Sequence, residues 1–265
     1  MHLGVAAVIF DWAGTTVDHG CLSPLAPFVE VFRRRGIALT AEQARGPMGV
    51  HKRTHLERLC ALPAVLAAWQ ARFGRAPGAA DVDALFAELV PLQLAVLPRF
   101  ATPVPGCQAT MAWLRERGIR IGTTTGYTRA MMDVLAPLAA AAGFSPDVLV
   151  AADEVAHARP WPDMCLRNLE LLGLADPGAC VKVDDTVVGI EEGLRAGMRT
   201  VGVVMTGNEL GLTEQELAAL EPVERERRRA AGYARLRAAG AHVVLDGIAE
   251  LPAALEGLMR HPAAG

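Results

Sequence analysis

The sequence predicts a doubly wound α/β fold, in which helices cover both faces of a parallel sheet. Short runs rich in Val and Ile alternate with helix-like stretches along most of the chain. These runs are apolar throughout, as is typical of strands buried on both faces. One long region, residues 22–99, breaks the alternation with helical patterns and no convincing strand. The chain is therefore expected to fold as an α/β core with a helical insertion directly after the first strand.

Six runs are predicted as strands because they are short, apolar and rich in β-branched residues: 5–10, 119–124, 148–151, 180–183, 200–204 and 242–245. The stretches between and after them have the spacing of amphipathic helices: 106–117, 128–142, 161–172, 189–196 and 247–258. Three of these helices are followed by a glycine suited to a left-handed helix end, namely Gly118, Gly143 and Gly197. Residues 214–239, which include an arginine-rich run, are expected to form two exposed helices.

The inserted region has helical patterns over 24–35, 41–45, 54–59, 64–73 and 81–97, and two prolines within 101–106 mark the return to the core. Ligands of open α/β sheets bind beyond the carboxyl ends of the strands, and the insertion begins at that edge. We therefore expect a core made of residues 1–20 and 101–265. Residues 21–100 are expected to form a helical cap domain that lies over the site as a lid.

Composition narrows the class of protein. The chain has 265 residues, of which 52% are hydrophobic and 21% charged, so it has enough apolar mass for a core. A net charge of −3 gives no reason to expect binding to nucleic acid. Five scattered cysteines without a CxxC pair favour a reducing cytoplasm over a disulfide scaffold. No signal peptide or membrane span is indicated.

Polar residues gather at the predicted strand ends. Asp11 follows the first strand, three threonines ending at Thr125 close the second, and Asp184-Asp185 close the fourth. Arg159 follows the third strand. Alone, Asp11 is as well explained by a carboxylate that caps the next turn. Together, these groups predict a phosphoryl-transfer site in which the acid pair holds Mg²⁺ and the hydroxyls and Arg159 hold a phosphate.

The chain contains only two lysines among its 26 basic residues, Lys52 and Lys182. In so arginine-rich a sequence, each lysine is a candidate for chemistry that arginine cannot perform. Lys52 lies in the insertion, where without further information a surface helix lysine is the simpler interpretation. Lys182 lies in a predicted buried strand just before the acid pair, which favours a structural role and leaves pairing with an aspartate as the alternative.

Five stretches carry a resemblance to a known family: AVIFDWAGTTVDHGC (7–21), GPMGVHKRTH (46–55), GTTTGYTRAMM (122–132), ARPWPDMC (158–165) and VKVDDT (181–186). The chain resembles the haloacid dehalogenase (HAD) superfamily of aspartate-nucleophile phosphotransferases and, within it, the phosphonoacetaldehyde hydrolases (phosphonatases). The resemblance runs through core and cap alike. The motif around Asp11 indicates only the superfamily, whereas the stretch around Lys52 together with Arg159-Pro160 is far more specific.

The resemblance implies a HAD-like Rossmannoid core and a role for each matched residue. Asp11 is the implied nucleophile, and Lys52 is the implied imine-forming amine. The implied Mg²⁺ ligands are Asp11, the Ala13 carbonyl and Asp185, with Asp184 close by. Phosphoryl oxygens are expected to bind to Thr125, Gly126 and Arg159. The remaining matched positions line the pocket: His55, Cys21, Met48 and Tyr127, of which His55 is also a candidate proton carrier and Cys21 is as readily a small apolar filler.

One departure from the superfamily pattern is chemically informative. Most members place a second aspartate two residues after the nucleophile, where it protonates the leaving oxygen of a phosphate ester. Here that residue is Ala13. A carbon–phosphorus bond leaves a carbanion instead, and a protonated lysine imine can accept that electron pair as an enamine. The absence of the acid and the presence of Lys52 therefore explain each other.

The resemblance thus implies hydrolysis of phosphonoacetaldehyde to acetaldehyde and phosphate, in the breakdown of 2-aminoethylphosphonate. It also implies a cytoplasmic homodimer that associates through cap helices. Two alternatives stay open: a phosphatase or phosphomutase acting on a small phosphate ester, and a phosphate-binding module without catalysis. Gly189 stands where many members carry a further acid, with Glu191 and Glu192 beyond it, which leaves the outer shell of the metal site undefined.

Overall fold

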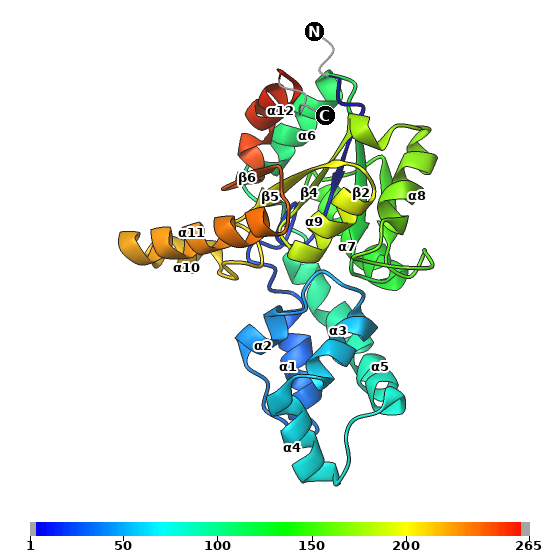
Figure 1. Ribbon diagram of the computed structural model, residues 1–265, viewed down its shortest axis with the longest axis vertical. Helices are drawn as coiled ribbons and strands as arrows, with labels where there is room; N and C mark the ends of the chain where they lie inside the picture. Colours follow the sequence, from blue (N-terminus) through cyan, green and yellow to red (C-terminus); the bar gives the residue numbers. More distant parts are fainter. Residues whose placement is uncertain (1–3, 261–265) are drawn as a thin grey trace.

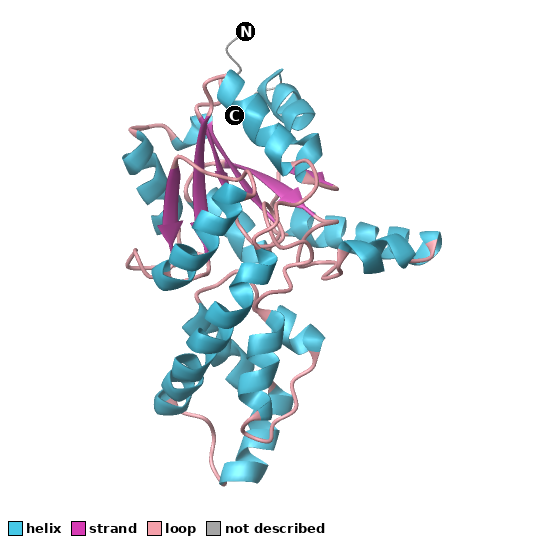
Figure 2. Cartoon of the chain, turned by 180° about the vertical axis from the view of Figure 1, so that it is seen from behind, coloured by secondary structure: helices cyan, strands magenta, loops and turns pink. Residues whose placement is uncertain are grey.

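A computed structural model describes residues 4–260 and shows a six-stranded parallel sheet between two layers of helices (Figures 1 and 2). The strand order is β3-β2-β1-β4-β5-β6, and every neighbouring pair is parallel. The strands are β1 (Ala7–Phe10), β2 (Arg120–Thr125), β3 (Val148–Ala151), β4 (Cys180–Asp184), β5 (Arg199–Val203) and β6 (Val243–Leu245). All six lie within a residue of the predicted runs, except that β1 begins two residues later, so the predicted doubly wound α/β core is confirmed.

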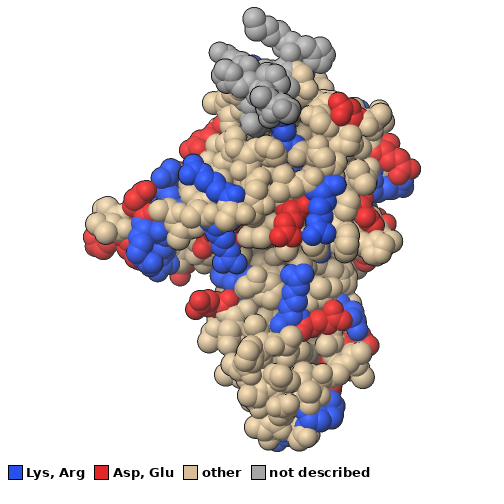
Figure 3. All heavy atoms as spheres, in the orientation of Figure 1, with Lys and Arg blue, Asp and Glu red and all other residues tan. Residues whose placement is uncertain are grey.

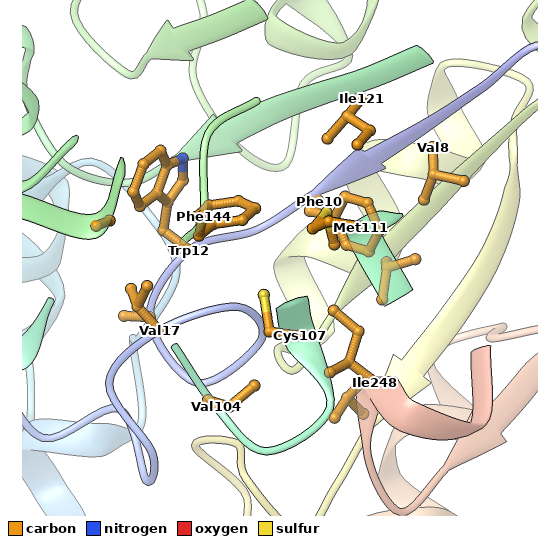
Figure 4. Packing of buried hydrophobic residues seen from close by; sticks show 14 of the residues in the cluster. Val8, Phe10, Trp12, Val17, Val104, Cys107, Met111, Ile121, Phe144 and Ile248 are labelled. Atoms are coloured by element: carbon orange, nitrogen blue, oxygen red, sulfur yellow. The ribbon is translucent and has the colours of Figure 1, made fainter. Parts of the chain in front are cut away.

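The central strand β1 shows why the sequence runs predicted as strands are apolar throughout. Val8 and Phe10 face one helix layer, where they pack with Met111 and Ile248 (Figure 4). Ala7 and Ile9 belong to a separate cluster on the opposite face. Because side chains alternate between the faces of a strand and both faces are covered, every position of β1 is buried.

Helices α6 (Cys107–Glu116), α7 (Arg129–Ala141) and α12 (Leu251–Arg260) contribute to the cluster on the Val8 face. Helix α8 (Asp163–Leu172) and Ala196, the residue that follows α9 (Val187–Arg195), contribute to the other. Thr128 and Thr186 cap α7 and α9 by accepting backbone N–H bonds, so these helices begin at the strand tips. Gly118, Gly143 and Gly197 have positive φ angles, as their positions after the helices predict. Short 3₁₀ turns, η2 (Pro177–Ala179) and η3 (Ile248–Glu250), precede β4 and α12.

The helices between β1 and α6 form a second body below the sheet in Figure 1. It contains α1 (Leu25–Arg33), α2 (Ala41–Arg45), α3 (Lys52–Cys60), α4 (Pro63–Phe73) and α5 (Ala79–Val96), followed by the 3₁₀ turn η1 (Leu97–Phe100). Its apolar cluster draws on residues of this region alone, including Phe28, Leu56, Trp69 and Leu89. The helical insertion therefore has a hydrophobic core of its own, packed against the strand edge at which ligands of α/β folds bind.

A helical arm projects from the side of the core (Figure 1). It consists of α10 (Glu214–Ala219) and α11 (Pro222–Ala238), as predicted, and only Leu217, Gly232 and Leu236 of these two helices are buried. Arg227, Arg228 and Arg229 pair with nearby acids, so charges of both signs lie along the arm (Figure 3). Among residues 4–260, the helices are too short or too polar to cross a lipid bilayer.

Candidate active site

The parallel sheet brings the predicted strand-end residues to one edge. Asp11 follows β1, Thr125 ends β2, and Asp184 ends β4, with Asp185 next in the chain. Arg159 reaches the same place from the loop after β3 and is 4% exposed. Strands that run in the same direction present their carboxyl ends together, so residues far apart in the sequence form one polar cluster.

Three carboxylates in this cluster form a candidate metal centre. Oxygens of Asp11, Asp184 and Asp185 lie within 4.8 Å of one another, and all three residues are buried. Burial and the charges of the other two aspartates raise the pKa of Asp185 well above its usual range. Burial and Asp184 likewise raise the pKa of Asp11 to about 6. Oxygen donors crowded in this way fit a divalent cation, which would relieve the repulsion between them.

Asp185 is held from two sides. Thr15 Oγ1 donates to one carboxylate oxygen at 2.9 Å, and the backbone N–H of Asn208 donates to the other at 2.7 Å. Gly14 has a φ of +91°, and a Cβ there would lie 2.3 Å from the carboxylate, so only glycine fits beside Asp185. The turn after β1 and the loop after β5 therefore fix the orientation of this side chain.

Arg159 is the central cation of the site. One guanidinium nitrogen lies 2.8 Å from Asp11 and 3.2 Å from Asp184, and Nε lies 2.9 Å from Glu192. The same guanidinium donates to the carbonyl of Gly49 in the cap at 3.3 Å. Arg159 thus contacts the predicted nucleophile and the cap at once, and its charge faces the space in which a phosphoryl group would sit.

Behind Arg159 lies a buried ionic cluster of Lys182, Glu192 and Thr124. Lys182 Nζ is 2.9 Å from Asp184 and 3.4 Å from Glu192. The Thr124 hydroxyl accepts hydrogen bonds from Lys182 and Arg159 and donates to Glu192 at 3.0 Å. Lys182 therefore pairs with an aspartate, the alternative that the sequence left open, and also fills a structural position inside the sheet.

Glu192 is the member of this cluster that sequence reasoning missed. It lies in α9 and is fully buried. It stands further along the chain than Gly189, the position at which many superfamily members carry an acid. A Cβ at Gly189 would lie 2.0 Å from the Asp184 carboxylate, so no acid fits there. One signal was available, because Glu192 falls on the same face of α9 as the buried Gly189.

Lys52 approaches from the cap. Helix α3 begins at Lys52, two residues earlier than predicted, because the His51 side chain accepts the Arg53 backbone N–H as a cap. The Lys52 amine lies 4.4 Å from the Tyr127 ring centroid and 5.8 Å from that of Phe28. Lys52 is 3% exposed, and burial lowers the pKa of its amine to about 8.

His55 lies one helical turn after Lys52, on the same side of α3. Its Nε2–H donates to the Ala44 carbonyl at 2.8 Å, so Nδ1 keeps a free lone pair, and that atom is buried without a hydrogen-bond partner. Burial and the nearby Lys52 charge hold the pKa of His55 well below its usual value. The ring also stacks on Phe28, with centroids 3.9 Å apart. His55 is therefore neutral and firmly positioned.

A pocket joins the two halves of the site. Most of the predicted residues line it: Asp11, Ala13, Cys21, Met48, Lys52, Thr125, Gly126, Tyr127 and Arg159, together with the unpredicted Pro24, Gly49 and Thr186. His55, Asp184 and Asp185 lie outside this lining. Burial raises the pKa of the Cys21 thiol well above its usual value, so Cys21 is present as the neutral thiol.

The cap is closed on the core. A Cβ at Gly126 would lie 2.6 Å from the Val50 carbonyl, and one at Gly49 would lie 2.6 Å from the Thr186 hydroxyl. These glycines allow the cap loop to lie directly on the backbone beside Thr125. Lys52 and Asp11 therefore face one small, buried space, and the cap excludes bulk water from it.

Comparison with known proteins gives a consistent result. A sequence model of the haloacid dehalogenase-like hydrolases matches residues 5–197. A phosphonoacetaldehyde hydrolase of Hahella chejuensis is 45% identical over 98% of this chain and 89% of its own length. A protein of the same name from Klebsiella pneumoniae is 49% identical over 94% of this chain and 93% of its own.

Solved structures agree with these relatives. A phosphonoacetaldehyde hydrolase-like protein from Oleispira antarctica superposes with a TM-score of 0.95 at 38% identity, covering 97% of this chain and 93% of its own. A putative β-phosphoglucomutase from Bacteroides vulgatus reaches a TM-score of 0.68 at 17% identity, with 97% and 91% coverage, which shows a shared fold alone.

Proposed function

The chain belongs to the haloacid dehalogenase-like hydrolases and, within them, to the phosphonoacetaldehyde hydrolases, and from this premise we propose how its residues break a carbon–phosphorus bond. The substrate is phosphonoacetaldehyde, and the products are acetaldehyde and phosphate. One observation carries the proposal. A buried amine with a pKa of about 8 shares a single small pocket with a buried carboxylate that contacts an arginine.

The first step takes place at Lys52. Its neutral amine attacks the aldehyde carbon, and uptake of one proton with loss of water leaves a protonated imine. A lysine in water is almost fully protonated at pH 7, whereas an amine with a pKa of about 8 is neutral in about one molecule in ten. The free Nδ1 lone pair of the neutral His55 provides a proton acceptor one helical turn from this amine.

The second step takes place at Asp11, whose carboxylate attacks phosphorus. The carbon–phosphorus bond breaks, its electron pair enters the imine to form an enamine, and the phosphoryl group is left on Asp11. Arg159 and the backbone around Thr125 and Gly126 orient the phosphoryl oxygens. Protonation and hydrolysis of the enamine release acetaldehyde and restore Lys52. Water then attacks the aspartyl phosphate and releases phosphate.

The carboxylates of Asp11, Asp184 and Asp185 and the Ala13 carbonyl would hold Mg²⁺, which when bound offsets negative charge on the phosphoryl group. Ala13 lines the pocket and carries no proton to give. This disfavours the alternative of an ester phosphatase or phosphomutase, because an alkoxide leaving group needs a proton at that point. An enamine needs none at the moment of bond cleavage.

Borohydride reduction tests the proposal directly. Addition of phosphonoacetaldehyde and borohydride should inactivate the protein and leave a reduced two-carbon adduct on Lys52, detected by peptide mass spectrometry. Lys182, the only other lysine, is buried in the sheet and serves as the internal control. Lys52→Arg keeps the charge but cannot form an imine, so it should lower kcat by at least about 10⁴-fold.

An adduct-free wild type or an active Lys52→Arg variant would contradict the imine mechanism. Phosphatase activity on a small phosphate ester without any adduct would instead support the alternative. Asp11→Asn should abolish turnover in both cases and therefore acts as the shared negative control.

Four further features belong to this proposal. Residues 1–20 and 101–265 form the catalytic core and residues 21–100 the cap, in keeping with the separate apolar cluster of the cap. The five free, buried cysteines fit a reducing cytoplasm. A homodimer through cap helices, and a place in the breakdown of 2-aminoethylphosphonate, follow from the family alone.

A further inference from the structure

The loop of residues 205–212 contacts the core of the site and the cap at the same time. On the core side, the Asn208 backbone N–H donates to Asp185 at 2.7 Å, and the Thr206 hydroxyl donates to the Gly14 carbonyl at 2.7 Å. On the other side, the Gly20 N–H, in the linker to the cap, donates to the Thr206 carbonyl at 2.7 Å. This loop is therefore the element through which the cap and Asp185 meet.

Arg45, the last residue of α2 in the cap, fastens this junction. Its guanidinium donates to the Gly20 carbonyl at 2.9 Å, the Gly211 carbonyl at 2.9 Å, and the Cys21 carbonyl and Asn208 Oδ1 at 3.3 Å each. All four acceptors are neutral oxygens, two from the linker and two from the loop. A planar guanidinium can serve acceptors on both sides at once, because its N–H groups point outward in fixed directions.

Two glycines lie so close to this contact that a side chain would not fit at either position. A Cβ on Gly211, whose φ is +63°, would lie 2.5 Å from the Arg45 guanidinium carbon. A Cβ on Gly20, whose φ is +90°, would lie 2.3 Å from the Leu212 carbonyl oxygen. The linker, the loop and the arginine are thus packed at contact distance, so a displacement of the cap would be passed to residues 205–212.

We propose that Arg45 is a positioning residue for Asp185: it clamps residues 205–212 against the linker when the cap is closed and thereby sets the carboxylate for metal binding. Asn208 is the connecting residue, because its side chain accepts from Arg45 while its backbone N–H holds the carboxylate. The proposal rests on the proposed function in taking Asp185 as a ligand of Mg²⁺. It places part of the control of the metal site in the cap, away from the Lys52 surface.

The test compares four single variants and one double variant with the wild type. Arg45→Ala removes the clamp, Arg45→Lys keeps its charge, and Asn208→Ala removes the connecting side chain but keeps the backbone donor. Arg34→Ala is the matched control, because Arg34 is an exposed cap arginine paired with Glu30. The hydrogen-exchange rates of residues 18–22 and 205–212 report on the clamp itself. The Mg²⁺ affinity, measured by calorimetric titration in the absence of substrate, reports on the positioning of Asp185.

Arg45→Ala should accelerate exchange in both segments at least about 10-fold and weaken Mg²⁺ binding by about 10-fold, as is typical when a group supporting a metal ligand is lost. Arg45→Lys should rescue neither, since an ammonium cannot reach all four acceptors. Asn208→Ala should weaken Mg²⁺ binding similarly, and the double variant Arg45→Ala with Asn208→Ala should be no worse than the single ones. Arg34→Ala should match the wild type.

The proposal would be overturned if the exchange rates and the Mg²⁺ affinity of Arg45→Ala both lay within twofold of those of Arg34→Ala. Faster exchange with unchanged Mg²⁺ affinity would also overturn it, because the clamp would then be structural only, and so would a wild type that binds no Mg²⁺. A wild type that binds Mg²⁺ but does not cleave phosphonoacetaldehyde would overturn the proposed function alone, since neither readout here depends on turnover.

Discussion

The two lysines of the chain lie in two regions of the same site, and the pKa values of their amines are shifted in opposite directions. Lys52, on the cap, faces the rings of Tyr127 and Phe28, and burial lowers the pKa of its amine to about 8. Lys182, in the sheet, is buried just as deeply, yet contact with Asp184 and Glu192 raises the pKa of its amine above the usual value.

The difference lies in what surrounds each amine. Removing an ammonium group from water disfavours its charge, and only a carboxylate in direct contact restores it. Among residues 4–260, no carboxylate lies within ion-pair distance of Lys52 Nζ, whereas two lie within 3.4 Å of Lys182 Nζ. The cap region therefore holds an amine suited to nucleophilic attack. The sheet region holds a permanent cation suited to balancing buried acids.

The largest expected effect is a difference in stability between two methionine substitutions. Lys182→Met should lower the free energy of unfolding by about 3–5 kcal/mol, because it leaves buried acids with one cation fewer. Lys52→Met should raise it by about 1–3 kcal/mol at pH 7, because folding no longer has to desolvate an unpaired ammonium. Urea unfolding in metal-free buffer measures both values.

The pH dependence gives this prediction its control. The folded state binds the Lys52 proton less tightly than the unfolded state does, so the gain from Lys52→Met should be full below about pH 8. It should disappear as the pH approaches 10.5, the usual pKa of the amine. The comparison would be contradicted if both substitutions changed the free energy of unfolding in the same direction, or if the gain in stability from Lys52→Met did not change with pH.

A smaller effect is expected in the rate of imine formation. Because only the neutral amine attacks, the rate of borohydride trapping should rise about 10-fold per pH unit below 8 and level off above it. The rising part of this pH–rate profile, the trapping limb, is obtained by measuring the rate of borohydride trapping by the wild type at a series of pH values in the same buffer. A limb centred near pH 10 would show that burial does not lower the pKa of Lys52.

The smallest effect concerns the ring beneath the amine. The face of Tyr127 favours the ammonium form of Lys52 by about 0.5–1 kcal/mol, which is about half a pKa unit. Tyr127→Leu should therefore move the trapping limb to lower pH by about that amount. Tyr127→Phe keeps the ring and serves as the control, since it loses only the hydroxyl that contacts Ser23 at 2.6 Å. A shift to higher pH, or an equal shift in both variants, would contradict the role of the ring face.

Much of the site follows from local sequence. Strand-end positions predict Asp11, Thr125 and the Asp184-Asp185 pair, because parallel strands end at one edge and polar residues at the tips of buried strands stand out. The imine hypothesis for Lys52 follows from the missing acid at Ala13 and the family motif. The roles of Glu192, Thr124 and Asn208 could not be assigned, because each makes a contact with a residue at least 23 positions away.

The sequence by itself thus determined which elements form, their order, and which end of the sheet carries the chemistry, because hydrophobic periodicity and turn residues act over a few neighbours. Only the tertiary structure decided the state of each charged group. The same residue type has an amine with a lowered pKa at position 52 and an amine with a raised pKa at position 182, because electrostatic energy in a buried site depends on the groups within a few ångströms in space, whatever their distance along the chain.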